Sequence, residues 1–357
     1  MLSKFYGIRF ISELQRHGRW RTSVLMVGTA WISLLLFAVV PAPFGMLCFL
    51  LNGFTLGFMW GVVFSYVEGR RTTDFIGVVL AVSFIFAGGF SRSVGKWLML
   101  DWGVSEYWMP FATASVFVLP LLVFYVLMEK APLPDAADEQ ERTVRKPMNS
   151  EERKLFLQQY KWGVVAFVII YLLLTIMRDL RDNYMANMWN ELGYAKNAAV
   201  FAKTETITSL AVLALIGTLV FVRKNMKAFR MIHWLLMLGF VLAGAASLLF
   251  HLKMLDGALW MQLTGLGLYI AYVLFNSVFF ERLLATFGVA GNVGFLIYLA
   301  DAWGYLGSIS VMLSKELFKL QLNWVSFYSL LVIVFAVIGI AASLFSYNYF
   351  NRKYNRQ

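Results

Sequence analysis

The stretch Val63-Phe64-Ser65-Tyr66-Val67-Glu68-Gly69-Arg70 ends one long apolar segment, and Val278-Phe279-Phe280-Glu281-Arg282 ends another in the second half of the chain. Glu281 follows Glu68 by 213 residues (281 − 68), and the neighbouring apolar segments keep this offset. The pairs it relates are 22–41 with 231–252, 44–67 with 257–280, 75–97 with 288–310, and 108–128 with roughly 321–347. We therefore predict that the chain contains a parallel internal repeat.

The two halves of this repeat are unequal in length. The second half has six membrane-length apolar segments, and the four of the first half match the last four of these six. Applied backwards, the offset places the counterparts of 162–188 and 200–222 before or around Met1. Two helices of a six-helix half are therefore expected to be missing, or nearly so, before Met1.

The composition is that of a membrane protein, with 60% hydrophobic residues and a mean hydropathy of +0.68. These residues form blocks of about 20, the length at which a helix spans roughly 30 Å of hydrocarbon. Membrane strands would instead alternate apolar and polar residues over about 10 positions, and this pattern does not occur. We predict an all-α fold, a polytopic membrane helix bundle with about 10 transmembrane helices, four followed by six.

Lysine and arginine predict the orientation of these helices. With the N-terminus in the cytoplasm, 22 of the 31 basic residues, Lys4 among them, fall on the cytoplasmic side and 4 fall in external loops. This bias predicts that both termini are cytoplasmic, in the inner or plasma membrane. The net charge of +11 is then explained by topology and by anionic lipid headgroups, and it does not indicate a nucleic-acid partner.

A polar segment divides the chain. Residues 129–161 hold the only dense run of charge and proline, and they separate an incomplete bundle at 1–128 from a six-helix bundle at 162–357. Within this linker, Asn149 is followed three residues later by Glu152, a pattern that predicts the start of a short interfacial helix. Two bundles joined by a long cytoplasmic loop are the layout of a secondary transporter.

The order of the segments resembles that of the major facilitator superfamily. Ser3-Lys4-Phe5-Tyr6-Gly7-Ile8-Arg9 and Arg16-His17-Gly18-Arg19-Trp20-Arg21 are similar to the end of helix 2 and to the basic loop before helix 3. The acidic residue that the family places before the first Arg of this loop is replaced by Gln15. The resemblance implies a transporter-like protein that lacks helix 1 and most of helix 2. Glu68-Gly69-Arg70-Arg71 and Arg178-Asp179-Leu180-Arg181-Asp182-Asn183 are similar to a bacterial branch distantly related to organophosphate/phosphate exchangers.

The charged run at 178–183 lies inside an apolar segment, where ionisable side chains cost about 3 kcal/mol and mark function. Arg178, Arg181 and Asp182 share a helix face, and Arg178 and Asp182 are spaced to neutralise each other. One interpretation is a guanidinium that binds an anionic substrate, with Asn183 beside it. The alternative is a self-satisfied charge ladder at the membrane–water boundary that gates or locks helices without contact to substrate.

A second set of intramembrane charges comprises Arg92, Lys96 and Asp301. The repeat offset places Asp301 at Gly88, one helical turn from Arg92, so the two halves carry opposite charges at matching depth. Both are candidates for substrate contact. A structural bridge between the bundles is favoured over a proton relay.

The last set of charges lies on the predicted cytoplasmic face, between the second and third spans of the first half and at the corresponding place in the second half. These residues are predicted to form salt bridges between helices that stabilise one access state, as gate charges: Glu68, Arg70, Arg71, Asp74, Glu281 and Arg282.

Two functions follow from these observations. The first is a secondary active transporter that moves a small anionic solute by alternating access, in the lipid bilayer, with an unspecified coupling ion. The second is a truncated or non-transporting membrane protein that acts as a structural or assembly partner, with another protein supplying the missing helices. No motif for catalysis, for a cofactor or for a metal occurs in the sequence, so we expect no enzyme activity, no cofactor and no metal site.

Overall fold

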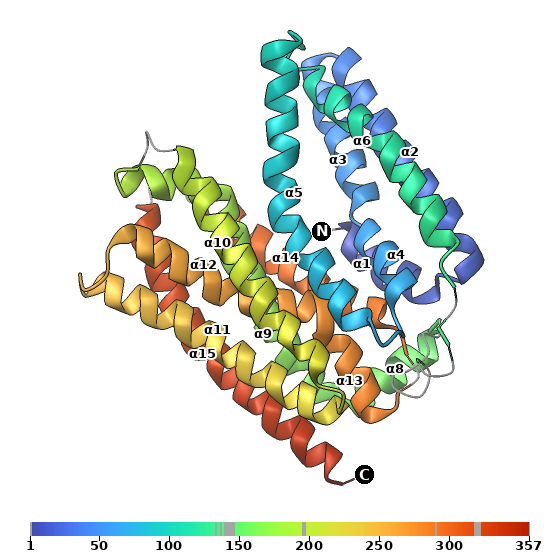
Figure 1. Ribbon diagram of the computed structural model, residues 1–357, viewed down its shortest axis with the longest axis vertical. Helices are drawn as coiled ribbons and strands as arrows, with labels where there is room; N and C mark the ends of the chain where they lie inside the picture. Colours follow the sequence, from blue (N-terminus) through green and yellow to red (C-terminus); the bar gives the residue numbers. More distant parts are fainter. Residues whose placement is uncertain are drawn as a thin grey trace.

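The computed structural model describes residues 2–132, 134–135, 138, 147–194, 198–289, 291–317 and 323–356. All regular secondary structure in these ranges is helical, as predicted. Figure 1 shows two groups of long helices that are splayed at one end and approach each other at the other, near α4, α8 and α13. We call the second end the linker end, because α8 belongs to the segment that joins the groups.

The helices before the linker are α1 (Leu2–Glu13), α2 (Arg16–Val39), α3 (Ala42–Leu56), α4 (Met59–Val67), α5 (Thr73–Asp101) and α6 (Met109–Glu129). From the linker onward they are α8 (Ser150–Gln159), α9 (Lys161–Glu191), α10 (Ala198–Gly217), η1 (Thr218–Phe221), α11 (Asn225–His251), α12 (Gly257–Leu274), η2 (Phe275–Phe279), α13 (Phe280–Phe287), α14 (Val293–Leu317) and α15 (Trp324–Tyr354).

Eight segments of the described residues are long and apolar enough to cross a membrane. They coincide with α2, α3–α4, α6, α9, α11, α12–α13, α14 and α15. The remaining two predicted spans correspond to α5 and α10, which contain shorter apolar stretches at Phe75–Phe84 and Thr204–Gly217. The chain is therefore a multi-pass membrane protein, and the count of ten spans stays a prediction.

The short helix predicted in the linker is confirmed as α8. The Asn149 side chain accepts hydrogen bonds from the backbone N–H groups of Glu151 and Glu152, and the Glu152 side chain accepts one from the backbone of Asn149. This reciprocal capping box satisfies the N–H groups that a helix leaves unpaired at its start. It fixes the point where the linker becomes helical again before α9.

Two spans are interrupted close to the space between the groups. The span before α5 breaks at Gly57 and Phe58, between α3 and α4. The span formed by α12 and α13 contains the π-helical turn η2. A π-turn widens the helix by one residue and frequently occurs at functional sites. Here it carries Asn276, whose position matters below.

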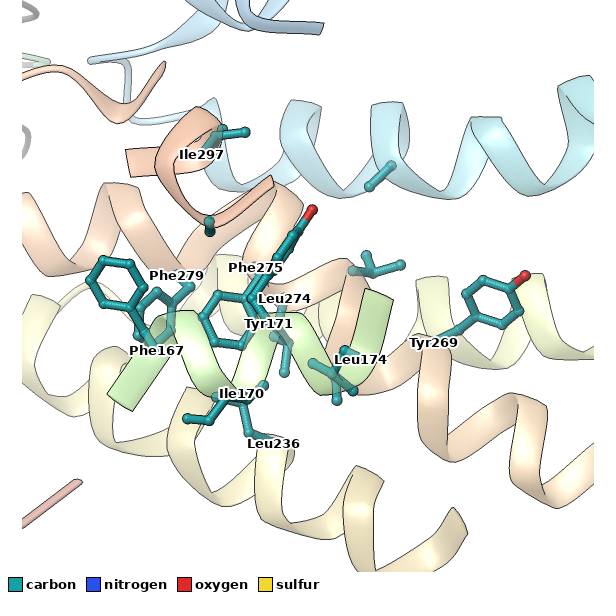
Figure 2. Close-up of a cluster of buried hydrophobic side chains, with 14 of the residues drawn as sticks. Phe167, Ile170, Tyr171, Leu174, Leu236, Tyr269, Leu274, Phe275, Phe279 and Ile297 are labelled. Atoms are coloured by element: carbon teal, nitrogen blue, oxygen red, sulfur yellow. The ribbon is translucent and has the colours of Figure 1, made fainter. Parts of the chain in front are cut away.

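The apolar core lies mainly among the helices after the linker. Figure 2 shows α9 side chains meeting those of α11, η2 and α12, with Phe167, Ile170, Tyr171, Leu174, Leu236, Leu274, Phe275 and Phe279 labelled. Phe167, Ile170 and Leu174 follow a helical spacing along one face of α9 and are all fully buried. This face fixes the rotation of α9 and therefore the direction in which its charged residues point.

The short helix α1 packs on α14, so the start of the chain contacts the second group directly. Ser3, Gly7 and Ile11 recur every fourth residue on its buried face. An added Cβ at Gly7 would clash with the ring of Tyr298 in α14, which shows how closely the two helices approach. The Tyr298 hydroxyl in turn donates to the carbonyl of Gly57 at 2.8 Å, at the break between α3 and α4.

Candidate functional site

A cavity of about 540 Å³ lies between the two groups of helices. Its walls come from α1, α3, α4 and α5 on one side and from α9, α12, η2 and α14 on the other. The lining residues are Lys4, Leu56, Gly57, Met59, Trp60, Ala81, Phe84, Arg178, Asp182, Tyr269, Tyr272, Val273, Asn276, Asp301 and Tyr305. A concave, mostly apolar space lined by a few polar groups is the usual form of a small-molecule site.

One ion pair lines this cavity and joins α1 to α14. Lys4 Nζ of α1 lies 2.8 Å from Asp301 Oδ2 of α14, and both side chains are largely buried. Asp301 Oδ1 also accepts a hydrogen bond from the Tyr171 hydroxyl of α9. Because a buried charge is tolerated only when it is paired and hydrogen-bonded, each member of this pair depends on the other. The pair therefore joins α1, before the linker, to α14, after it, at the wall of the cavity.

A second cation, Arg178, enters the cavity from α9. Its guanidinium pairs with the adjacent Asp179 and donates to the hydroxyls of Tyr272 and Tyr305. The guanidinium carbon also lies 4.6 Å from the ring centre of Tyr272 and 5.5 Å from that of Tyr305. These rings and hydroxyls hold Arg178 in one orientation.

The ring of Tyr305 lies near both cations. Lys4 Nζ is 5.7 Å from its centre and the Arg178 guanidinium is 5.5 Å from it. Lys4 belongs to the first group of helices and Arg178 to the second. A single small anion near Tyr305 could therefore contact positive charge from both groups.

Arg181, the other predicted arginine, does not line the cavity. Its side chain is completely buried and its Nη1 atom lies 2.8 Å from Glu205 Oε1 of α10, as an ion pair without hydrogen-bond geometry. The guanidinium also lies 5.6 Å from the ring centre of Tyr269. It packs so closely on Gly265 of α12 that an added Cβ there would be 2.6 Å away. Its position suits a structural link between α9, α10 and α12.

Asp182 lines the cavity, whereas its neighbour Asn183 turns back on its own helix. The Tyr269 hydroxyl donates to Asp182 at 2.9 Å, and the Asn183 side chain donates to the carbonyl of Asp179 at 2.8 Å. The expected pairing of Arg178 with Asp182 is replaced by that of Arg178 with Asp179. The reason is that tyrosines of α12 and α14 attract the two side chains in different directions.

The sequence suggested that Asp301 pairs with Arg92, but the partner that the structure shows is a different residue. The side chain of Arg92 lies outside the described residues, and Asp301 pairs with Lys4. The charge count had assigned Lys4 to the cytoplasmic surface. The spacing of Ser3, Gly7 and Ile11 was the available signal, because it marks α1 as a buried helix. The tyrosines that frame the cations have no comparable sequence signal.

At the linker end, two glutamates related by the repeat offset each reach the opposite group. Glu68 accepts a hydrogen bond from the backbone N–H of Val293, the first residue of α14, at 2.5 Å. Glu281 accepts one from the backbone N–H of Gly69 at 3.3 Å. Both glutamates are buried. Both contacts are carboxylate-to-backbone bonds, and the salt bridges between helices that the sequence suggested stay a prediction.

The remaining candidate gate charges contact the linker or their own group. Arg70 donates to the carbonyl of Pro132, and Arg282 donates to Asn225 at 3.0 Å. Arg71 binds Asp138 through its backbone N–H and its side chain, and these bonds hold the pKa of the Asp138 carboxyl below its usual value. The side chain of Asp74 lies outside the described residues.

A further contact at this end joins α1 to the linker and to α14. The carbonyl of Ser12 accepts from the Met148 N–H at 2.9 Å and from the Asn292 side chain at 3.1 Å. Arg153 of α8 donates to the Ser12 hydroxyl and to Glu13. The linker end is therefore closed by several bonds between the two groups.

Comparison with known proteins places this architecture in a class. The solved structure of the proton:xylose symporter XylE matches at 14% identity with a TM-score of 0.61, covering 96% of this chain and 84% of the symporter. The structure of the E. coli fucose:proton symporter FucP matches at 12% identity with a TM-score of 0.55, covering 97% of this chain and 87% of FucP. The structure of the human organic anion transporter MFSD10 matches at 12% identity with a TM-score of 0.53, covering 96% of this chain and 82% of the transporter. The fold is that of the major facilitator superfamily.

The sequence itself defines a narrower group. Residues 1–353 match the family described as a family of unknown function (DUF5690), and the chain belongs to that family. No curated protein matches the chain.

Proposed function

We propose that the protein is a secondary transporter that moves a small anionic solute through the cavity by alternating access. The observation that carries this proposal is the placement of Lys4 and Arg178, two cations from opposite groups, around one tyrosine in one cavity. The names of the structural neighbours, which are symporters and an organic anion transporter, support transport as the activity. The proposal includes an inner or plasma membrane location with cytoplasmic termini, and no enzyme activity.

The ion pairs in the cavity supply a physical route from binding to conformational change. An incoming carboxylate or phosphate ester would compete with Asp301 for Lys4 and with Asp179 for Arg178. Arginine offers parallel N–H groups that match either anion. A ligand shifts a conformational equilibrium only through contacts that differ between the states. Exchange of the Lys4–Asp301 bridge for a bridge through the solute provides such a difference.

A zwitterionic solute is a second candidate, because Asp182 lines the same cavity and is exposed to it. The carboxylate has the Tyr269 hydroxyl as a neutral partner. An ammonium group on the solute could pair with Asp182 while its anionic group meets Arg178.

Uptake into proteoliposomes tests both candidates. Purified protein would be reconstituted and challenged with labelled monocarboxylates, dicarboxylates, phosphate esters and amino acids, with protein-free liposomes as the control. We expect accumulation of an anion, and we expect it to fall more than tenfold in Arg178→Lys. Uptake restricted to amino acids and abolished by Asp182→Asn would favour the zwitterion. Absence of uptake for the whole panel, with protein that remains folded, would favour a structural or assembly role.

A further inference from the structure

A second hollow, separate from the central cavity, lies at the C-terminal end of α15. Its volume is about 650 Å³. It is lined by the last residue of α8 and by the final turns of α15: Gln159, Phe345, Asn348, Tyr349, Arg352, Lys353 and Arg356. We call it the α15 pocket.

The charge of the α15 pocket is entirely positive. Its lining includes Arg352, Lys353 and Arg356, and no aspartate or glutamate is among the lining residues. Lys353 is held in place, since its Nζ donates to the carbonyl of Gln159 at 2.7 Å and lies 4.6 Å from the ring centre of Tyr160. Arg352 and Arg356 are exposed and one helical turn apart, so both guanidinium groups can reach the same anion.

The wall of the α15 pocket toward the centre of the span is apolar. Phe345 lies seven residues before Arg352, roughly 10 Å along the helix, and its side chain is 50% exposed. Both residues belong to the segment Trp324–Tyr354, which is long and apolar enough to cross the membrane. A ligand that follows this surface would place a negative group at the helix end and apolar chains along Phe345.

We propose that the α15 pocket binds the headgroup of an anionic phospholipid, with the acyl chains lying against Phe345. The headgroup phosphate would accept hydrogen bonds from Arg352 and Arg356 and would meet the fixed charge of Lys353. Basic pockets between membrane helices are a recognised form of site for anionic headgroups. The proposal does not depend on the transport activity, because none of these residues lines the central cavity.

The test measures which lipids remain bound to the purified protein. Delipidated protein would be returned to a mixture of phosphatidylglycerol and phosphatidylcholine, and the retained lipids counted by native mass spectrometry. We expect wild type to retain phosphatidylglycerol preferentially. The affinity of the double variant Arg352→Gln/Arg356→Gln for phosphatidylglycerol should be roughly 30-fold lower, because it lacks two cations near the headgroup.

A matched control lies on the other side of α15. Lys224 and Lys227 are also exposed and basic, and they line a separate hollow of about 520 Å³ at the start of α11. Lys224→Gln/Lys227→Gln removes the same charge and should leave retention nearly unchanged. An equal loss in both double variants would overturn the site, because it would indicate general attraction to a basic end. Unchanged retention in the α15 variant would overturn it as well.

Two further measurements are needed. The first distinguishes a lipid headgroup from free phosphate as the ligand, and the second tests whether the variant still folds normally. Inorganic phosphate added at the concentration of the lipid should leave phosphatidylglycerol bound, and efficient displacement would contradict a lipid site. Thermal unfolding in pure phosphatidylcholine should be the same for wild type and the α15 variant, because both arginines are exposed. Added phosphatidylglycerol should then raise the unfolding temperature of wild type alone.

Discussion

Arg178 and Arg181 stand three residues apart on α9, yet their surroundings give them different tasks. Arg178 meets the cavity between two tyrosines, whereas Arg181 is fully buried against Glu205 and Gly265. A guanidinium at the cavity can exchange partners with a solute, because the solute can reach it. A guanidinium enclosed between α9, α10 and α12 stabilises the packing of these helices instead.

This difference gives the first prediction. Arg178→Lys keeps the charge but loses the planar fork, at a cost of about 1.5 to 3 kcal/mol for hydrogen bonds to a charged group. We expect solute uptake to fall about 10- to 100-fold while the amount of protein in the membrane is unchanged. Uptake in proteoliposomes and quantitative immunoblotting of membranes measure the two quantities.

The contrasting variant is Arg181→Lys. Its shorter reach breaks the ion pair with Glu205, so we expect a lower yield of folded protein and little change in uptake per folded molecule. If Arg178→Lys transported normally, the assignment of Arg178 to substrate would be wrong.

The second prediction concerns the bridge between Lys4 and Asp301. Removal of one member of a buried ion pair costs about 3 to 5 kcal/mol, since the other charge is left without a partner. Lys4→Met and Asp301→Asn should therefore each destabilise the protein strongly. The double variant should recover much of the loss, and thermal unfolding of the four proteins in detergent measures the coupling. Additive losses would show that the two side chains do not act as a pair.

The same residues show how far sequence could reach. The charged run at 178–183 identified Arg178 and Asp182 because charges at bilayer depth must face the interior of a bundle or a cavity. Sequence spacing could not decide between Asp179 and Asp182 as the partner of Arg178, because tyrosines on α12 and α14 make that choice. Lys4 was counted with the cytoplasmic charges, since a charge count does not distinguish a headgroup contact from a buried pair.

Among the elements, helices α11 and α12 cross with their backbones in close contact at Gly239 and Gly267. A Cβ added to Gly267 would lie 2.5 Å from the carbonyl oxygen of Gly239, and the reverse substitution meets the same obstacle. Small residues at such a crossing let two membrane helices make dense van der Waals contact. Neither residue can be enlarged without moving a backbone.

The third prediction follows from this crossing. Gly267→Ala should force α11 and α12 apart and destabilise the protein by about 1 to 3 kcal/mol, the usual range for overpacking. Gly28→Ala is the control, because an added Cβ in α2 has no atom within 4 Å. Thermal unfolding in detergent should show a clear decrease for the first variant and a small change for the second. Equal stability of the two variants would contradict the crossing.

The membrane-spanning helices could be predicted from the sequence, because segment length and hydropathy determine them almost independently of the helices that pack beside them. The capping box at Asn149 was readable for the same reason, since it involves only residues three apart. The break at Gly57 and the π-turn at Phe275–Phe279 were not anticipated. Both depend on packing between groups far apart in sequence, where Tyr298 bonds the freed carbonyl of Gly57.

For the whole molecule, the question is what holds the linker end closed. The two glutamates that end corresponding segments of the repeat each bond a backbone N–H of the other group. The bond from Val293 lies at the N-terminus of α14, where the helix dipole also favours a negative charge. Bonds of this kind contribute about 0.5 to 2 kcal/mol each. Two of them are sufficient to bias an equilibrium between open and closed states.

The last prediction is that Glu68→Gln/Glu281→Gln opens the linker end. An amide accepts a hydrogen bond more weakly than a carboxylate and has no charge for the helix dipole, so the closed state should lose about 1 to 3 kcal/mol. That loss corresponds to roughly a 5- to 150-fold shift in population. Spin labels on Thr72, between α4 and α5, and on Lys227 of α11 lie on exposed residues of opposite groups. Read by pulsed electron resonance, they should show a longer distance distribution in the variant.

Arg70→Gln is the control for this shift, because the Arg70 side chain donates to the carbonyls of Pro132 in the linker and of Tyr66 in α4, and neither acceptor belongs to the opposite group. Its distance distribution should match that of wild type. If the glutamate variant also kept the wild-type distribution, the bonds through Ser12, Met148 and Asn292 would be sufficient to hold the end closed. The glutamates would then be packing residues, and the repeat offset that pairs them would have no role in the access equilibrium.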